Sequence, residues 1–168
     1  MSETEDPGVR PLAGHSPGQE RALGGYAVLM GTFGGLAAGF GTWLRRSGRK
    51  LPGRAASSDL LLVTVATHKC ARILARDRVT STVRAPFTRF QGDAGPSEVD
   101  EQARGRGLRR AVGELVVCPY CLDMWTASGF VAGLIVAPDA TRWVATLFTV
   151  LTGADALQIA HGKAESLL

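Results

Sequence analysis

Residues 22–44 read ALGGYAVLMGTFGGLAAGFGTWL and contain no charged side chain. As a helix that rises 1.5 Å per residue, this run is roughly 34 Å long, which is enough to cross a hydrocarbon core of about 30 Å. A soluble helix in a chain of 168 residues would show a polar face, and this run shows none. We therefore predict a transmembrane helix over residues 22–44, preceded by a mobile tail over residues 1–21.

The charges on either side of this run predict its orientation. Residues 45–54 carry five basic side chains and no acid, whereas residues 1–21 carry four acids and two arginines. The positive-inside rule then places the N-terminus outside and makes residues 45–58 a basic cytosolic loop, which can contact anionic lipid head groups. Nucleic-acid binding is not expected, because neither interleaved aromatic residues nor a helix-turn-helix pattern accompanies these arginines.

Two further apolar runs lie near the C-terminus. Residues 121–137 and 143–160 are joined by the five residues PDATR, which predicts an antiparallel transmembrane hairpin over residues 118–160. Its tip would face outside, and a cytosolic C-terminal tail would follow over residues 161–168. Asp155 falls inside the second run, where a carboxylate is costly unless it is paired, so we expect a structural ion pair with the basic side chains of His68, Lys69 and Arg72.

The segment over residues 59–76 combines a short apolar run with a basic stripe. Residues 60–67 are uncharged, but His68, Arg72 and Arg76 then follow at intervals of four and form a basic stripe. This pattern favours an amphipathic helix at the cytosolic face, with a short transmembrane helix as the alternative.

The predicted fold is therefore an all-α integral membrane protein with three transmembrane helices and one amphipathic interfacial helix, or alternatively with four spans. Residues 77–117 are rich in glycine, proline and mixed charges, so we expect a basic loop there that ends in a short helix over residues 108–117. In the first span, Gly31, Gly35 and Gly39 line one helix face, which predicts a packing surface and a homodimer.

The motif Cys-Pro-Tyr-Cys over residues 118–121 is the strongest candidate for chemistry. Pro119 suits the first helical position, which makes Cys118 the N-cap and places Cys121 in the first turn. The free amide groups and the helix dipole there favour a thiolate. A membrane thiol-disulfide oxidoreductase that uses Cys118 and Cys121 is one interpretation, although the long apolar run that follows does not fit a soluble glutaredoxin.

Zinc binding is a second interpretation of this motif. A Cys-x-x-Cys turn supplies two of the four ligands that a structural zinc site needs, and His68 or Cys70 could supply others if their helix packs nearby. Under the third interpretation, Cys118 and Cys121 are only small packing residues at a helix entry.

Three stretches together resemble a known family: residues 59–90, residues 113–121 and the tryptophan that follows the second cysteine by four residues. Residues 59–160 are similar to the uncharacterised bacterial membrane-protein family known as domain of unknown function 1360, which includes sporulation-associated YjcA-like proteins. The residues that carry the resemblance are Arg72, Asp77, Arg84, Pro86, Phe87, Gly113, Glu114, Leu115, Cys118, Cys121 and Trp125. Asp123 departs from the pattern, since the family is associated with a small residue at that position.

The resemblance implies a multi-pass protein of the bacterial cell membrane and no established activity. The sequence as a whole therefore predicts a membrane protein of unknown function, more consistent with a non-enzymatic membrane or interaction component than with an enzyme.

Overall fold

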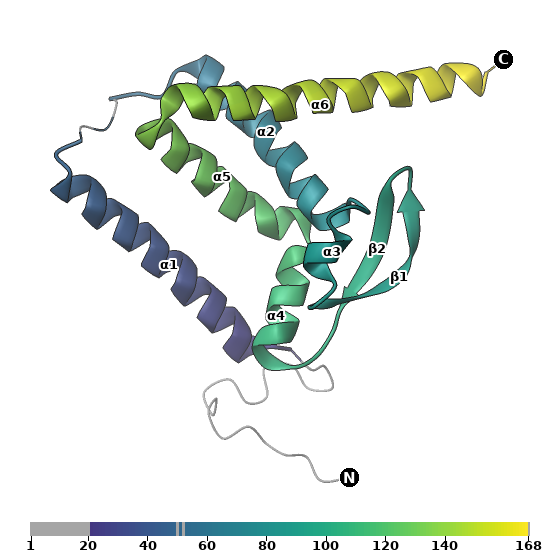
Figure 1. Ribbon diagram of the computed structural model, residues 1–168, viewed down its shortest axis with the longest axis horizontal. Coiled ribbons are helices and arrows are strands. Elements are labelled where there is room, and N and C mark those ends of the chain that lie inside the picture. The colour runs from purple at the N-terminus through teal and green to yellow at the C-terminus, as the bar shows by residue number, and fades with distance from the viewer. Residues whose placement is uncertain (1–20, 50, 52, 168) are drawn as a thin grey trace, which may run out of the picture.

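The computed structural model describes residues 21–49, 51 and 53–167, so the predicted N-terminal tail lies outside the described residues except for Arg21. The described part contains six helices and one two-stranded sheet (Figure 1). In chain order, the elements are α1 (Leu23–Arg46), α2 (Ser57–Arg76), α3 (Ser81–Arg84), β1 (Thr88–Gly95), β2 (Glu98–Ala103), α4 (Gly107–Val116), α5 (Pro119–Val136) and α6 (Pro138–Glu165).

Three helices, α1, α5 and α6, are long and apolar enough to cross a membrane. They correspond to the three apolar runs of the sequence, but α6 is longer than predicted at both ends. Only Ala137 separates α5 from α6, because Pro138 takes the first helical position and the expected turn PDATR becomes the start of α6. At its other end α6 continues to Glu165, so most of the predicted C-terminal tail is helical, and this part extends past the other helices (Figure 1).

Helix α2 packs lengthwise against α5 and α6. Near its N-terminal half, Val63 and Ala66 form a buried cluster with Ala145 of α6. Near its C-terminal half, Ala71 and Ala75 form a second cluster with the α5 residue Leu122. The alanines at these contacts are almost completely buried, which allows close approach between helix backbones.

We call α2, α5 and α6 together the helical assembly. Polar contacts lie at both of its ends. At one end, the Arg49 guanidinium donates to the backbone oxygen of Val136 at 3.0 Å, and Arg142 of α6 forms an ion pair with Asp59 of α2 at 2.9 Å. At the other end, α2 meets the hairpin through a bridge between Asp77 and Glu98. Helix α2 is therefore antiparallel to α5, and it joins the two ends of the assembly.

This geometry fixes how α2 and the cysteine motif lie relative to α5. Helix α2 lies along α5 and α6, and both the interfacial and the transmembrane interpretation of this helix stay predictions. The basic segment and the cysteine motif lie at opposite ends of α5. The sequence could not show this because the packing partners of α2 come from segments far along the chain.

The all-α expectation is wrong for residues 88–103, which form an antiparallel β-hairpin instead of a loop. Val99 and Glu101 are buried on the inward face of β2, and one of these two is a carboxylate, so no apolar alternation announces the strand. The turn is shaped by Gly95 and by Ser97, whose φ of 63° is in the left-handed region. We call α3, β1, β2 and α4 together the hairpin module.

Helix α1 is attached mainly through its N-terminal end, where it packs on α4. A Cβ atom at Gly25 would lie 2.6 Å from the Cβ of Ala111, so glycine is needed for this close contact. Further along α1, the rings of Phe33 and Trp125 meet edge to face at 5.2 Å.

Candidate functional site

The cysteine motif caps the N-terminus of α5, as the sequence predicts. Cys118 is the N-cap, Pro119 takes the first helical position, and the backbone N–H of Cys121 donates to the Sγ of Cys118 at 3.2 Å. This bond satisfies one of the backbone N–H groups that the start of α5 leaves without a partner in the helix. Both cysteines are free thiols, and Cys121 and the neighbouring Tyr120 are exposed to approach by another molecule.

The zinc ligands considered from the sequence do not come together in one chain. Cys70 lines an apolar pocket between α2, α5 and α6, whereas His68 lines a different, polar pocket. Across the described ranges, no group of three or more His, Cys, Asp or Glu side chains is arranged to hold a metal ion. Within the described ranges, Cys118 and Cys121 therefore have no third metal ligand beside them.

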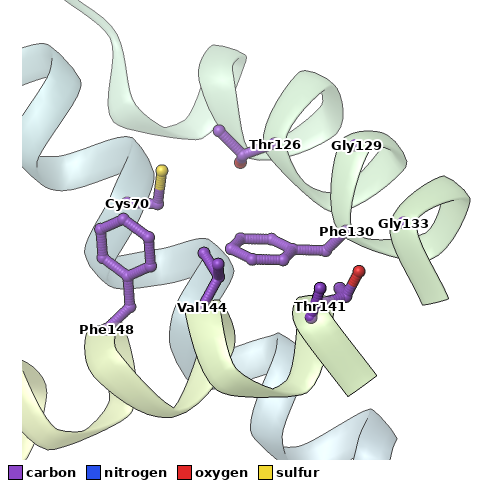
Figure 2. A pocket seen from close by; sticks show the side chains of 9 residues that line it. Cys70, Thr126, Gly129, Phe130, Gly133, Thr141, Val144 and Phe148 are labelled. Atoms are coloured by element: carbon purple, nitrogen blue, oxygen red, sulfur yellow. The ribbon is translucent and has the colours of Figure 1, made fainter. Parts of the chain in front are cut away.

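The apolar pocket has a volume of about 400 Å³ and lies where α5 and α6 diverge (Figure 2). Near the turn, the two helices approach so closely that a Cβ atom at Gly133 would lie 2.6 Å from the Oγ1 of Thr141. Farther along, the rings of Phe130 and Phe148 meet edge to face at 6.2 Å. The polar side chains that line this space are Cys70 from α2, Thr126 and Thr141, and the other lining residues are apolar or glycine (Figure 2).

The polar pocket has a volume of about 350 Å³ and lies between α2, the β-hairpin and the first turns of α5. It adjoins the cysteine motif, since Pro119 and Tyr120 form part of its wall. Its charged and titratable lining residues are His68, Arg72, Arg76, Glu98 and Asp123.

The two arginines that line this pocket form ion pairs with carboxylates of the hairpin. The Nε and Nη2 of Arg72 donate to the two carboxylate oxygens of Glu98 at 2.8 and 3.0 Å, and Arg76 pairs with Asp100 at 2.9 Å. Arg72 therefore does not pair with Asp155, in contrast to the expectation from the sequence, because Glu98 of the folded-back hairpin is its partner.

Asp155 has Lys69 as its partner. The Lys69 Nζ donates to the Asp155 carboxylate and joins α2 to α6. The Lys69 side chain is 14% exposed and that of Asp155 is 49% exposed, so the lysine is the more buried of the two. The pair lowers the cost of carrying either charge on helices that pack against each other.

The hairpin module is built around a buried arginine. Arg84 is 2% exposed, and its Nε donates to Glu101 at 3.0 Å. Its two terminal nitrogens donate to the backbone oxygens of Leu74 at 2.7 Å and Asp77 at 2.9 Å, near the end of α2. Arg84 thus ties the hairpin to α2 and satisfies carbonyl groups that the helix end leaves open.

Glu101 receives several hydrogen bonds in this network. The hydroxyl groups of Ser81 and Thr88 donate to its carboxylate at 2.6 and 2.8 Å. Burial alone would raise the pKa of Glu101, but the hydrogen bonds from Arg84, Ser81 and Thr88 hold the pKa below the ordinary value of a glutamate. The carboxylate is therefore the form that the folded module stabilises.

Most residues that carry the family resemblance serve this architecture. A Cβ atom at Gly113 would lie 2.5 Å from the backbone oxygen of Phe87, so glycine allows α4 to pack against the base of the hairpin. Glu114 accepts hydrogen bonds from Tyr26 of α1 and from Arg110, and thereby links α1 to α4. Leu115 packs against the cluster between α2 and α5. The shared pattern thus describes how the hairpin module is attached to the helices.

Two features of the site were not recognised from the sequence. The first feature is the buried position of Glu101. Residues two apart lie on the same face of a strand, so an inward-facing Val99 would have indicated that Glu101 faces inward as well. The second feature is the burial of the Asp123 Oδ1. No local signal indicates this burial, since it depends on where the hairpin folds.

Comparison with known proteins gives two matches. The model of a family described as "Protein of unknown function (DUF1360)" matches residues 62–161. The sporulation protein YjcA of Bacillus subtilis (strain 168) is 29% identical over 94 residues, which cover 54% of this chain and 80% of that protein. No solved structure matches. Because the family model covers more than half of the sequence, the chain belongs to the DUF1360 family of proteins of unknown function.

Proposed function

We propose that the protein is a non-enzymatic, multi-pass component of the bacterial cell membrane in which α2 crosses the bilayer together with α1, α5 and α6. The observation that carries this proposal is the lengthwise packing of α2 against α5. The 20 residues of α2 span roughly 30 Å. If α5 crosses the hydrocarbon core, a helix packed along it passes through the same layer.

The charges on the second half of α2 are compatible with this position. Lys69 is paired with Asp155, Arg72 with Glu98 and Arg76 with Asp100. Pairing lowers the cost of carrying charges into or near the membrane, and long basic side chains also reach toward the interface.

The proposed orientation follows from the positive-inside rule. With the basic segment in the cytosol, the N-terminus is outside, and a crossing α2 puts the cysteine motif and the hairpin module outside as well. The C-terminus of α6 then also lies outside, whereas three spans had suggested a cytosolic C-terminus.

The basic end of α1 is the proposed contact for anionic lipid head groups. Arg45 and Arg46 close α1, and the Arg49 guanidinium lies over the ring of Trp43 at 5.6 Å from its centroid. A tryptophan beside several arginines is typical of the boundary between the hydrocarbon core and the head groups. A homodimer through Gly31, Gly35 and Gly39 remains a prediction, and a Cβ atom at any of these positions would meet no atom of the described chain within 4 Å.

Replacing both Arg45 and Arg46 by Gln is expected to weaken binding of phosphatidylglycerol relative to phosphatidylcholine by roughly 30-fold. The physical reason is that each basic residue near an anionic surface contributes about 1 kcal/mol, and each 1.4 kcal/mol corresponds to about tenfold in affinity. Competition between labelled and unlabelled lipids, with the purified protein in nanodiscs, measures the preference.

The matched control removes two positive charges from the hairpin end, through Arg78→Gln and Arg89→Gln. An equal loss of preference in both double variants would show that net charge matters and not the end of α1, and the proposed lipid contact would then be wrong.

Thiol-disulfide exchange is a second candidate function, favoured by the hydrogen bond from the Cys121 N–H to the Cys118 Sγ. In this reaction, the Cys118 thiolate attacks a partner disulfide and releases one partner thiolate. The Cys121 sulfur, after losing its proton, then displaces the second partner thiolate. The partner disulfide is thereby reduced, and Cys118 and Cys121 become joined by a disulfide.

If exchange occurs, Cys121→Ser should trap a mixed disulfide on Cys118, because the resolving thiol is missing. Non-reducing electrophoresis of membranes that are alkylated in acid detects this adduct. Cys118→Ser should trap none, and Cys70→Ser serves as the control that keeps both motif thiols. Absence of an adduct in the Cys121→Ser variant, at normal yield of folded protein, would rule out this reaction.

A further inference from the structure

We propose that the polar pocket beside the cysteine motif binds a phosphoethanolamine group, with its primary ammonium at Asp123 and its phosphate at the α2 cations. This site is separate from the basic end of α1, and it does not depend on the lipid contact proposed there. The pocket brings the Asp123 carboxylate, two arginines and a histidine together around one cavity.

Asp123 contributes a buried carboxylate oxygen, Oδ1, without a hydrogen-bond partner among the described residues. A buried polar atom without a partner costs about 1–3 kcal/mol, and more when it is charged. Asp123 lines a cavity of about 350 Å³, so a donor that enters the cavity lies beside its carboxylate.

The basic side chains of α2 lie around the same cavity but do not form an ion pair with this carboxylate. His68, Arg72 and Arg76 all line the pocket, yet within the described chain none of them forms an ion pair with Asp123. Such a pair requires a separation of about 4 Å or less between nitrogen and oxygen. A gap therefore separates the negative and positive groups, and the cavity occupies it.

The arginines keep donors available for a ligand although they are paired. A guanidinium has five N–H groups, and Arg72 uses two of its nitrogens on Glu98 while Arg76 uses one on Asp100. The Arg72 side chain is 48% exposed and that of Arg76 is 35% exposed. His68 adds a ring nitrogen from the preceding turn of α2.

This arrangement suits a ligand that carries both charges. With each arginine balanced by a hairpin carboxylate, a simple anion would leave Asp123 unsatisfied and would be repelled by it. A simple cation would satisfy Asp123 but would face the α2 cations. A phosphoethanolamine group presents N–H donors at one end and phosphate oxygens at the other, so it matches both sides of the cavity.

The decisive measurement compares lipids that differ only in methylation of the amine. Wild-type protein in nanodiscs is titrated with phosphatidylethanolamine, its N-methyl and N,N-dimethyl forms, and phosphatidylcholine, all with the same acyl chains. We expect binding to weaken with each methyl group and to fall about tenfold overall, because the quaternary amine of phosphatidylcholine has no N–H to donate to Asp123. Equal binding of all four lipids would overturn the proposal without any change to the protein.

A pair of variants assigns the effect to the pocket. Asp123→Asn should abolish the preference for phosphatidylethanolamine over phosphatidylcholine, whereas Asp139→Asn, at the exposed opposite end of the assembly, should keep it. His68→Gln should lower affinity for both lipids, because it acts on the phosphate side. If Asp123→Asn keeps the full preference, the proposed role of Asp123 is wrong.

A soluble probe distinguishes the two sources of this head group. If glycerophosphoethanolamine competes with the lipid, the pocket recognises the head group alone, and a soluble ligand is a sufficient occupant. If the lipid binds with the same methylation dependence and the soluble compound does not compete, the acyl chains contribute and the ligand is a membrane lipid. Failure of both probes to bind overturns the proposal.

Discussion

Arg84→Ala is expected to destabilise the protein by about 3–5 kcal/mol, because it leaves the Glu101 carboxylate buried without its charged partner. The same change removes the donors to the backbone oxygens of Leu74 and Asp77. The hairpin should therefore separate from the end of α2 before the apolar helices come apart. Chemical denaturation in detergent measures the loss of stability, and the rate of proteolysis within residues 88–103 measures the release of the hairpin.

Two comparisons make this expectation specific. Arg89→Ala removes an exposed arginine from the same hairpin and should change stability by less than about 0.5 kcal/mol. The double variant Arg84→Met with Glu101→Leu removes both buried charges and should recover part of the loss, since replacing a buried ion pair by apolar residues is often nearly neutral. If Arg84→Ala costs no more than Arg89→Ala, the buried pair does not hold the module.

Cysteine labelling from outside the cell should give an all-or-none result for the proposed topology. In a variant with Cys70, Cys118 and Cys121 replaced by Ser, an impermeant thiol reagent should label Ala94→Cys in intact cells. It should label Ala55→Cys only after the membrane is permeabilised. Both positions are exposed alanines, and they lie at opposite ends of the helical assembly.

The possible labelling patterns separate the models of the membrane arrangement. Labelling of both positions from the same side would mean that α2 does not cross, and it would restore the interfacial helix predicted from the sequence. The reverse pattern, with Ala55→Cys labelled in intact cells and Ala94→Cys protected, would keep the crossing but invert the whole molecule.

The apolar helices could be predicted from sequence because their signal is local. The run over residues 22–44 has no charge, and the N-cap at Cys118 follows from a proline in the next position. The length of α6 was underestimated because PDATR resembles a turn, although Pro138 is also an ordinary first residue of a helix.

The position of α2 and the β-hairpin could not be predicted because their determinants are not local. The charge of Lys69 is neutralised by Asp155, and that of Arg72 by a strand residue, Glu98. In the hairpin, Glu101 is buried at a position where an apolar residue would have given the alternating pattern of a strand. The polar pocket forms where α2, the β-hairpin and α5 meet. No sequence pattern therefore predicts its volume or the burial of the Asp123 oxygen.

The ion pair between Lys69 and Asp155 also has a consequence for biosynthesis. Helix α2 is not among the helices whose hydropathy suffices for crossing, and an unpaired lysine near a helix centre adds about 2.5–3.5 kcal/mol to the cost of insertion. Its partner lies 86 residues later and leaves the ribosome long after α2. On the proposed topology, α2 therefore stays at the membrane surface as an amphipathic helix until α6 has been synthesised. It enters the bilayer together with α6, so the last helix to be made completes the insertion of the second.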